Sequence, residues 1–241
     1  GAIRTTVYDN VIRVDNVQHC LMALLKLRQL PAFQPGAAPH VAQVTPAIPL
    51  AMTAPSSATA SELQHFRVMH KAVDIEPLLA EIDADSSLWE YNTSRQDRIT
   101  VQRETHSIYL RSAAKPFPPG VTSSNDVHAS RPTQLAAHFP SVLAWAEQFA
   151  AAQQGELGRA TLVRLAPRGR VYRHIDHGEY YRVRDRYHLV LRSPAGSLLC
   201  AGDEWVRMQP GECWWFNNKI PHEAYNASDD CRIHLIFDLQ R

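Results

Sequence analysis

The sequence predicts a mainly β fold with flanking helices, organised as a jelly roll. Residues 159–241 consist of short segments of alternating apolar and polar residues, broken repeatedly by Gly, Pro and Asn. Short strands at such spacing are typical of closed or double-sheet antiparallel barrels. The expected strands are 160–166, 171–176, 186–192, 197–201, 204–208, 212–217, 222–226 and 231–238.

The chain before this barrel changes character from one stretch to the next. Residues 1–33 predict a small segment of short strands and a helix, to which the sequence assigns no role. Residues 34–61 are rich in Ala and Pro, which predicts a linker or an extended arm. Residues 62–241 form the predicted functional domain, in which 62–158 leads into the barrel.

The lead-in segment is predicted to contain two strands and two helices. Residues 66–69 and 105–110 have strand character. Residues 74–82 predict a short helix with Asp74 as its N-cap. The clearest helix is expected over 132–152, where apolar residues recur at helical spacing.

Composition and charge argue against several classes of protein. The formal net charge of this 241-residue chain is +1, and both signs are mixed, so neither a nucleic-acid nor a membrane-surface binder is indicated. No run approaches the roughly eighteen apolar residues that a membrane span needs. The four cysteines form no CxxC pair, which predicts free thiols in a reducing compartment and a cytoplasmic protein. Oligomeric state has no signature in the sequence.

Three residues predict a mononuclear iron centre. His174 and Asp176 are two positions apart, so on a strand both side chains would point to one face. His222 follows a proline at the start of a later strand, at the expected rim of the barrel. Two imidazoles and one carboxylate bind one face of Fe(II) and leave the other face open for a co-substrate and O₂. His174, Asp176 and His222 are therefore the predicted metal ligands and catalytic residues.

Two further strands predict a site for an anionic co-substrate. Arg232 and His234 share one parity on the last strand, and Arg186 and His188 share one parity on another. Two arginines that point into an otherwise apolar barrel are costly unless an anion accompanies them. The planar guanidinium fork suits a carboxylate, and 2-oxoglutarate is a dicarboxylate of suitable size.

Each motif also has a simpler interpretation. Twelve histidines make a chance His-x-Asp pair common. Arg232 could form an ion pair with Asp229 or Asp230. His177 is a rival metal ligand, but its parity is opposite to that of His174, so we interpret it as a rim or substrate residue. The combination of order, spacing and parity favours the metal site over these alternatives.

Other residues near the predicted site receive provisional roles. The tract 180–184, with two tyrosines and two arginines, is expected in a loop at the barrel mouth. Its aromatic and basic side chains suit an anionic or amino-acid-like substrate group, but we favour a solvated loop. Asn217 or Glu223 is expected to orient a ligand imidazole. Trp214, Trp215, Phe216 and Tyr187 could form the wall of the pocket, although core packing is the expected role for most of them.

From about residue 66 to residue 239 the chain resembles the aspartyl/asparaginyl (and proline) β-hydroxylase family of Fe(II)/2-oxoglutarate-dependent dioxygenases, in its bacterial form. The motifs that carry the resemblance are His174-Ile175-Asp176, Arg186-Tyr187-His188, Gln209-Pro210-Gly211-Glu212, Phe216-Asn217-Asn218 through His222, and Arg232-Ile233-His234-Leu235. Residues 1–60 match no part of the family.

The resemblance implies a double-stranded β-helix, which is a cupin-like barrel, with iron held by His174, Asp176 and His222. It further implies contacts from Arg186, His188 and Arg232 to 2-oxoglutarate, with Arg232 on the far carboxylate. Animal protein-hydroxylating members have glycine at the position of Asp176, so this chain resembles the ordinary three-ligand version.

The expected reaction is hydroxylation of an unactivated C–H bond, with succinate and CO₂ as co-products. The implied substrate is an amino acid, a peptide or a lipid precursor, and no nucleic-acid partner is expected. Two alternatives stay open. One is a catalytically retired barrel that binds a small acid or peptide, and the other is a cupin-like metal enzyme that does not use 2-oxoglutarate.

Overall fold

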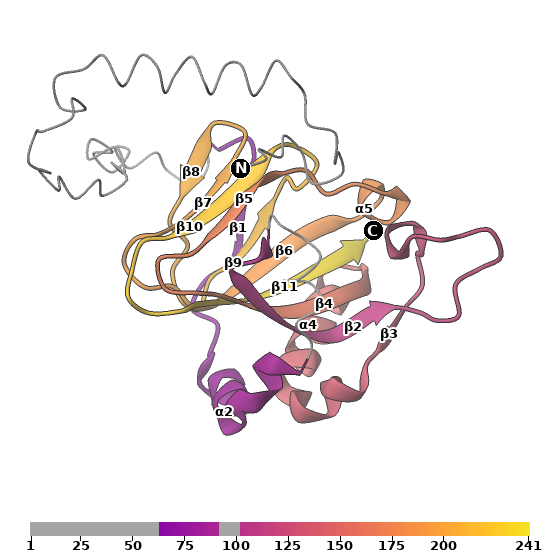
Figure 1. Cartoon of the computed structure of the whole chain (residues 1–241), viewed down its shortest axis with the longest axis horizontal. Coiled ribbons are helices and arrows are strands. Elements are labelled where there is room, and N and C mark those ends of the chain that lie inside the picture. The colour runs from indigo at the N-terminus through magenta and orange to yellow at the C-terminus, as the bar shows by residue number, and fades with distance from the viewer. Residues whose placement is uncertain (1–62, 92–101) are drawn as a thin grey trace, which may run out of the picture. The chain divides into compact units, whose positions relative to one another are not determined.

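The structure is a computed structural model that describes residues 63–91 and 102–241 (Figure 1). The segments 1–33 and 34–61 predicted from the sequence lie outside the described residues. The elements are β1 (Phe66–His70), α2 (Glu76–Ala84), η2 (Ser86–Glu90), β2 (Thr105–Ala113), η4 (Ser124–Asp126), β3 (Ser130–Pro132), η5 (Gln134–His138), α4 (Pro140–Ala152), β4 (Glu156–Leu165), β5 (Arg170–His174), α5 (Glu179–Arg182), β6 (Asp185–Arg192), β7 (Ser197–Ala201), β8 (Glu204–Val206), β9 (Cys213–Phe216), β10 (His222–Asn226) and β11 (Arg232–Gln240).

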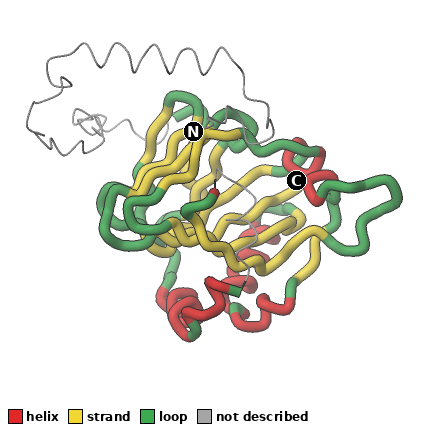
Figure 2. The backbone as a smooth tube through the Cα atoms, in the orientation of Figure 1, coloured by secondary structure: helices red, strands yellow, loops and turns green. Residues whose placement is uncertain are grey.

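The strands form two antiparallel sheets, which confirms the predicted jelly roll. The larger sheet has the order β1-β9-β6-β11-β4-β2-β3, and the smaller has the order β5-β10-β7-β8. From β4 onward the chain passes back and forth between the sheets, so that β4, β6, β9 and β11 lie in the larger sheet and the other four strands in the smaller. This alternation makes a double-stranded β-helix, and Figure 2 shows its strands in yellow.

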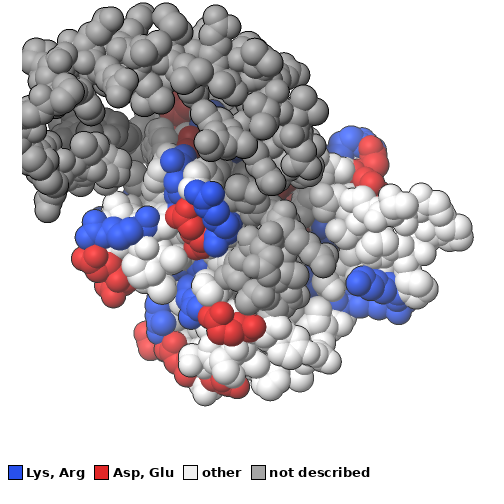
Figure 3. All heavy atoms as spheres, viewed as in Figure 1, with Lys and Arg blue, Asp and Glu red and all other residues white. Residues whose placement is uncertain are grey.

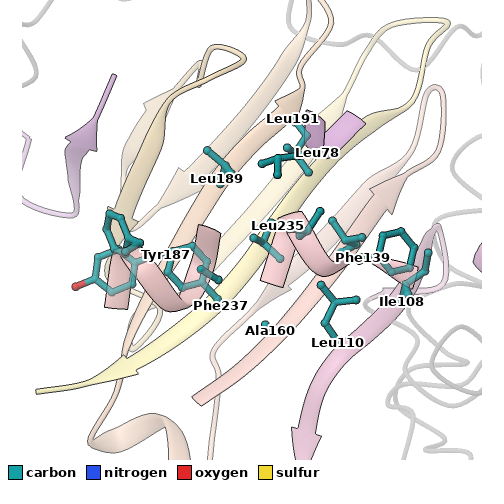
Figure 4. Close-up of a cluster of buried hydrophobic side chains, with 14 of the residues drawn as sticks. Leu78, Ile108, Leu110, Phe139, Ala160, Tyr187, Leu189, Leu191, Leu235 and Phe237 are labelled. Carbon is teal, nitrogen blue, oxygen red and sulfur yellow. The ribbon is translucent and has the colours of Figure 1, made fainter. Parts of the chain in front are cut away.

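Helices α2 and α4 cover the outer face of the larger sheet, away from the smaller sheet (Figure 1). The strands of the larger sheet contribute every second residue to this core, which also includes Phe139 just before α4 (Figure 4). On β11, for example, Ile233, Leu235 and Phe237 are almost fully buried in it. The helices therefore stabilise the sheet from outside and leave its inner face to the barrel.

A second apolar cluster lies between the sheets and closes part of the barrel. It combines Phe66, Val190, Trp214 and Phe216 from the larger sheet with Leu199 and Ala224 from the smaller, among others. Polar residues occupy the rest of the inner face. One part of the barrel interior is therefore an apolar core, and the other part can hold a functional site.

A β-bulge in β5 sets the direction of the predicted ligand strand. His222 pairs with His174 and Ala224 pairs with Val171, so Tyr172 and Arg173 together oppose the single residue Glu223. A bulge of this kind adds one residue to a strand and reverses the parity beyond it. His174 consequently lies beside His222, although strict alternation from Val171 would turn it to the other face.

The predicted helix over 132–152 is shorter than expected. Residues Ser130–Pro132 form β3, Gln134–His138 form a 3₁₀ turn, and α4 begins only at Pro140. The ring of a proline disfavours the helical conformation for the preceding residue. Phe139 accordingly has φ −132° and ψ 52°, which interrupts the helix at that point.

The predicted N-cap of α2 is also displaced. The helix begins at Glu76, and its N-cap residue is Ile75, which makes no side-chain capping bond. Asp74 still contributes, because its carboxylate accepts a hydrogen bond from the Glu76 amide at 3.3 Å. Pro77 thereby falls in the first turn, where its missing N–H costs no intrahelical bond.

The surface and the cysteines agree with the expectations from composition. Lysine and arginine side chains are interspersed with aspartate and glutamate on the face visible in Figure 3. Among the described residues Cys200, Cys213 and Cys231 are free thiols, and Cys20 lies outside those residues. No helix in the described part of the chain has the length and hydropathy that a membrane crossing requires.

Candidate metal centre

The structure brings the three predicted metal ligands together. His174 is the last residue of β5, His222 is the first residue of β10, and the two pair directly across the strands. Asp176 lies in the segment that follows β5 rather than on the strand. One ligand atom of each residue lies within 4.8 Å of the others, and each histidine Nε2 is 3.9 Å from an Asp176 carboxylate oxygen.

Backbone carbonyls orient both imidazoles. The Nδ1–H of His174 donates to the Tyr172 carbonyl at 2.7 Å, and that of His222 donates to the Ile220 carbonyl at 2.9 Å. A carbonyl can only accept, so the proton resides on Nδ1 and the Nε2 lone pair is available as a ligand. Burial lowers the pKa of His222 to about 4, against the opposing effect of Asp176, and this also favours the neutral imidazole.

Asp176 is largely buried, with its side chain 10 % exposed, and it is ionised. Its Oδ2 accepts hydrogen bonds from the Arg186 guanidinium at 2.5 Å and from the Asn218 amide at 3.0 Å. Burial is the largest single influence and raises the pKa of this carboxyl, but Arg186, His222, Asn218 and His174 together outweigh it, and the net pKa is lowered. Both hydrogen bonds fall on Oδ2, which leaves Oδ1 for another partner.

The turn after Asp176 requires glycine. Gly178 has φ +117°, and a Cβ at this position would lie 2.5 Å from the Asn125 carbonyl oxygen. Close packing of this turn against Asn125 holds the end of the ligand segment in place. His177 is exposed and does not belong to the group of three, in agreement with its interpretation as a rim residue.

Arg186 obtains its counter-ions from the protein itself. Besides Asp176, it binds Asp238 through two parallel contacts, Nε to Oδ1 at 2.8 Å and Nη2 to Oδ2 at 3.1 Å. Despite burial, which acts in the opposite direction, these two carboxylates raise the pKa of Arg186 well above its usual value. The argument that Arg186 needs an anion from a ligand is therefore wrong.

Arg232 has no such counter-ion. Its side chain is buried and makes no ion pair within the described residues, and its Nη1 lacks a hydrogen-bond partner there. Burial lowers the pKa of Arg232 to about 10. Asp229 pairs instead with Arg168 at 2.8 Å, so the simpler interpretation of Arg232 as its partner is wrong. The cost of an unpaired buried cation indicates that an anion belongs here.

The third predicted co-substrate residue, His188, lies on β6 two positions after Arg186. It is 3 % exposed, and its ring makes an edge contact with Phe216, which also contacts His222. Burial, reinforced by the charge of Arg232, lowers the pKa of His188 well below its usual value. Phe216 is thus one of the predicted wall residues that does contact the site, whereas Tyr187 packs in the outer core.

Several provisional roles change in the structure. Tyr180 is fully buried and belongs to α5, and Arg184 is buried as well, so the interpretation of 180–184 as a solvated loop is wrong. Glu223 points to the outer face of the smaller sheet, where it binds Arg170 and Arg173.

Two contributors were missed by the sequence analysis. Asn218, rather than its neighbour Asn217, donates to Asp176, while the Asn217 side chain accepts from the Lys219 amide. His234 was noted only for its parity, yet it contacts both Arg232 and His188. Parity alone was the available signal for His234, and no sequence signal distinguishes between the two asparagines.

The donor set fits a divalent transition metal and an organic dicarboxylate. Two neutral imidazoles with fixed Nδ1 protons and one ionised carboxylate suit Fe(II) at a site with open positions. The buried guanidinium of Arg232, with a free Nη1, suits a carboxylate.

Known proteins of similar sequence or fold were compared with the chain. Over 79 residues it is 30 % identical to an L-proline cis-4-hydroxylase of Rhizobium meliloti (strain 1021), a match that spans 33 % of this chain and 28 % of that relative. Among solved structures, a Pseudomonas putida prolyl-4-hydroxylase aligns with a TM-score of 0.47 and 16 % identity over 74 % of this chain and 94 % of its own. A 2OG-Fe(II) oxygenase family oxidoreductase of Burkholderia pseudomallei gives 0.44 and 10 %, over 58 % and 69 %.

The sequence model of one family, described as aspartyl/asparaginyl beta-hydroxylase, matches residues 85–241. This span covers well over half of the chain and includes β2 through β11 with every residue of the candidate metal centre. The chain therefore belongs to the aspartyl/asparaginyl β-hydroxylase family.

Proposed function

We propose that the protein is an Fe(II)/2-oxoglutarate-dependent dioxygenase that hydroxylates an unactivated C–H bond. The observation that carries the proposal is the coexistence, on one inner barrel surface, of the His174–Asp176–His222 group and the unpaired buried guanidinium of Arg232. The first group suits Fe(II), and the second suits the far carboxylate of a dicarboxylic co-substrate. Family membership supports the same conclusion.

In this proposal the residues divide into holding and orienting roles. His174 and His222 would bind the metal through Nε2, and Asp176 through its carboxylate, with Asn218 and Arg186 restraining the carboxylate. Arg232 and His188 would bind 2-oxoglutarate, and Arg186, although already paired, is placed to contact it beside Asp176. When bound, iron and 2-oxoglutarate supply the oxidising chemistry, in which O₂ is consumed and succinate and CO₂ are released.

The family and the matched relative indicate the broad class of the substrate. We propose a small amino-acid, peptide or lipid-type substrate, and among these a free amino acid such as proline is the first to test, because the matched relative is an L-proline hydroxylase. The apolar ring of Phe216 beside His222 would help to keep water away from the reacting bond.

The test is an anaerobic titration of the protein with Fe(II) and 2-oxoglutarate. We expect the visible charge-transfer absorption of an iron-bound 2-oxo acid, followed on admission of O₂ by succinate release that the true substrate stimulates. Amino acids, dipeptides and lipid precursors form the screening panel.

The same titration separates the two alternatives. A retired barrel would bind the acid without the absorption band, and a metal enzyme of another type would bind iron without responding to 2-oxoglutarate. Either result would refute the proposal.

A further inference from the structure

His234 connects two residues that the proposed function assigns to 2-oxoglutarate. Its Nε2 lies 3.1 Å from Arg232 Nε, and its Nδ1 lies 3.2 Å from His188 Nδ1. Arg232 and His234 are two apart on β11, and His188 is on the neighbouring strand β6, so all three face the barrel interior. His234 is 2 % exposed, so its ring is shielded from bulk solvent.

Arg232 determines which ring nitrogens of His234 and His188 donate and which accept hydrogen bonds. Arg232 only donates, so the ring nitrogen that faces it must accept. Its two contacts reach Nε2 at 3.1 Å and Nδ1 at 3.3 Å, and in a neutral imidazole one of these nitrogens carries the proton. If Nδ1 carries the proton, the repulsive donor–donor contact is the longer one, from Arg232 Nη2 to Nδ1 at 3.3 Å. The shorter contact, from Arg232 Nε to Nε2 at 3.1 Å, is then a hydrogen bond.

With its proton on Nδ1, His234 donates to Nδ1 of His188. That nitrogen then accepts, so the His188 proton resides on Nε2. Neutral rings are required for this arrangement, and burial together with the neighbouring Arg232 charge lowers the pKa of His234 well below its usual value. The Nη1 of Arg232 is a buried donor without a partner among the described residues, and the Nε2–H of His188 is the second donor that this arrangement provides.

We propose that His234 is a positioning residue that fixes the Arg232 guanidinium and the His188 tautomer, so that both present N–H groups to the carboxylates of 2-oxoglutarate. This inference rests on the proposed function. His234 would not touch the co-substrate; it would act only through Arg232 and His188. Losing an outer residue that orients a ligand-binding group typically costs about 10- to 100-fold in affinity or activity.

The first test needs no metal. Histidine labelled with ¹⁵N, observed through long-range ¹H–¹⁵N correlations in the metal-free protein, distinguishes an Nδ1–H ring from an Nε2–H ring. We expect His234 as the Nδ1–H form and His188 as the Nε2–H form, each assigned by its absence in a His→Gln variant. The opposite tautomer on either ring, or a protonated ring at pH 7.5, would overturn the proposal.

The second test measures 2-oxoglutarate binding by the anaerobic absorption titration. His234→Leu, which removes both ring nitrogens, should raise the dissociation constant of 2-oxoglutarate by at least about tenfold. His234→Gln retains one acceptor and one donor and should give a smaller increase than His234→Leu. Ile233→Val is the matched control, because Ile233 is the adjacent residue but packs in the outer core. It should stay within about twofold of the wild type.

Kinetics provide the further distinction between positioning and general loosening of the barrel. We expect His234→Leu to raise the KM for 2-oxoglutarate while kcat at saturation changes little, because the lost interaction affects binding. An unchanged dissociation constant in His234→Leu, or equal increases in all three variants, would refute the role of His234 alone. A wild-type protein without the absorption band would instead refute the proposed function, and this inference with it.

Discussion

The two faces of the larger sheet differ in what their residues do, although they alternate along the same strands. On β11, Leu235 and Phe237 face the helices and are completely buried in an apolar core. Arg232, His234 and Asp238 alternate with these residues along the same strand and face the barrel, where each makes a polar or ionic contact. Because successive side chains of a strand point to opposite faces, one strand carries apolar packing residues on one face and polar site residues on the other. The predictions below test how complete this separation is, from the largest expected effect to the smallest.

We expect the metal ligands on the inner face to be required for turnover but not for folding. We expect Asp176→Ala to abolish iron-dependent turnover of 2-oxoglutarate, an effect larger than the 10- to 100-fold loss typical of a residue that merely supports a ligand. Succinate formation and the thermal unfolding midpoint are the measurements. Asp203→Ala, in the exposed turn between β7 and β8, is the control and should retain full turnover. Full turnover in Asp176→Ala would show that the ligand assignment is wrong.

The two inner arginines should respond in opposite directions when their charge is removed. Arg186→Met leaves Asp176 and Asp238 buried without their counter-ion and should lower the free energy of unfolding by about 3–5 kcal/mol. Arg232→Met removes a buried cation that has no carboxylate partner, so the same quantity should stay unchanged or rise by about 1–3 kcal/mol. Urea unfolding of the metal-free variants measures both. Equal destabilisation would mean that Arg232 has a counter-ion after all.

Residues on the outer face should be required for stability but not for turnover, which is the reverse of the expectation for the metal ligands. Leu235→Ala opens a cavity under the helices and should lower the free energy of unfolding by about 2–5 kcal/mol. Turnover per folded molecule should stay near that of the wild type, because no inner side chain is altered. A large loss of turnover in the folded fraction would contradict the separation of the two faces.

Strand positions and parity could be read from the sequence because alternation is a local property. The observed bounds of β7 and β10 are those predicted, and the predicted ligands and Arg232 do line one barrel. What could not be read depends on pairing between distant strands. The counter-ion of Arg186 follows from the register that places Asp238 opposite it, and the direction of His174 follows from a bulge opposite Glu223. Neither the register nor the bulge can be recognised from the sequence of the strand itself.

The neighbouring asparagines provide the smallest and most local test of which groups orient the ligands. Asn218 is 1 % exposed and donates to Asp176 Oδ2, whereas the Asn217 side chain closes a turn through the Lys219 amide. We expect Asn218→Ala to weaken Fe(II) binding by about tenfold, since Asp176 keeps Arg186 but loses its second restraint. Asn217→Ala should bind Fe(II) as the wild type does. Both constants can be measured by anaerobic competition with a coloured chelator. The contrast should persist in the intact fold, because the Asn218 carbonyl still accepts the Asp176 amide after its side chain is removed.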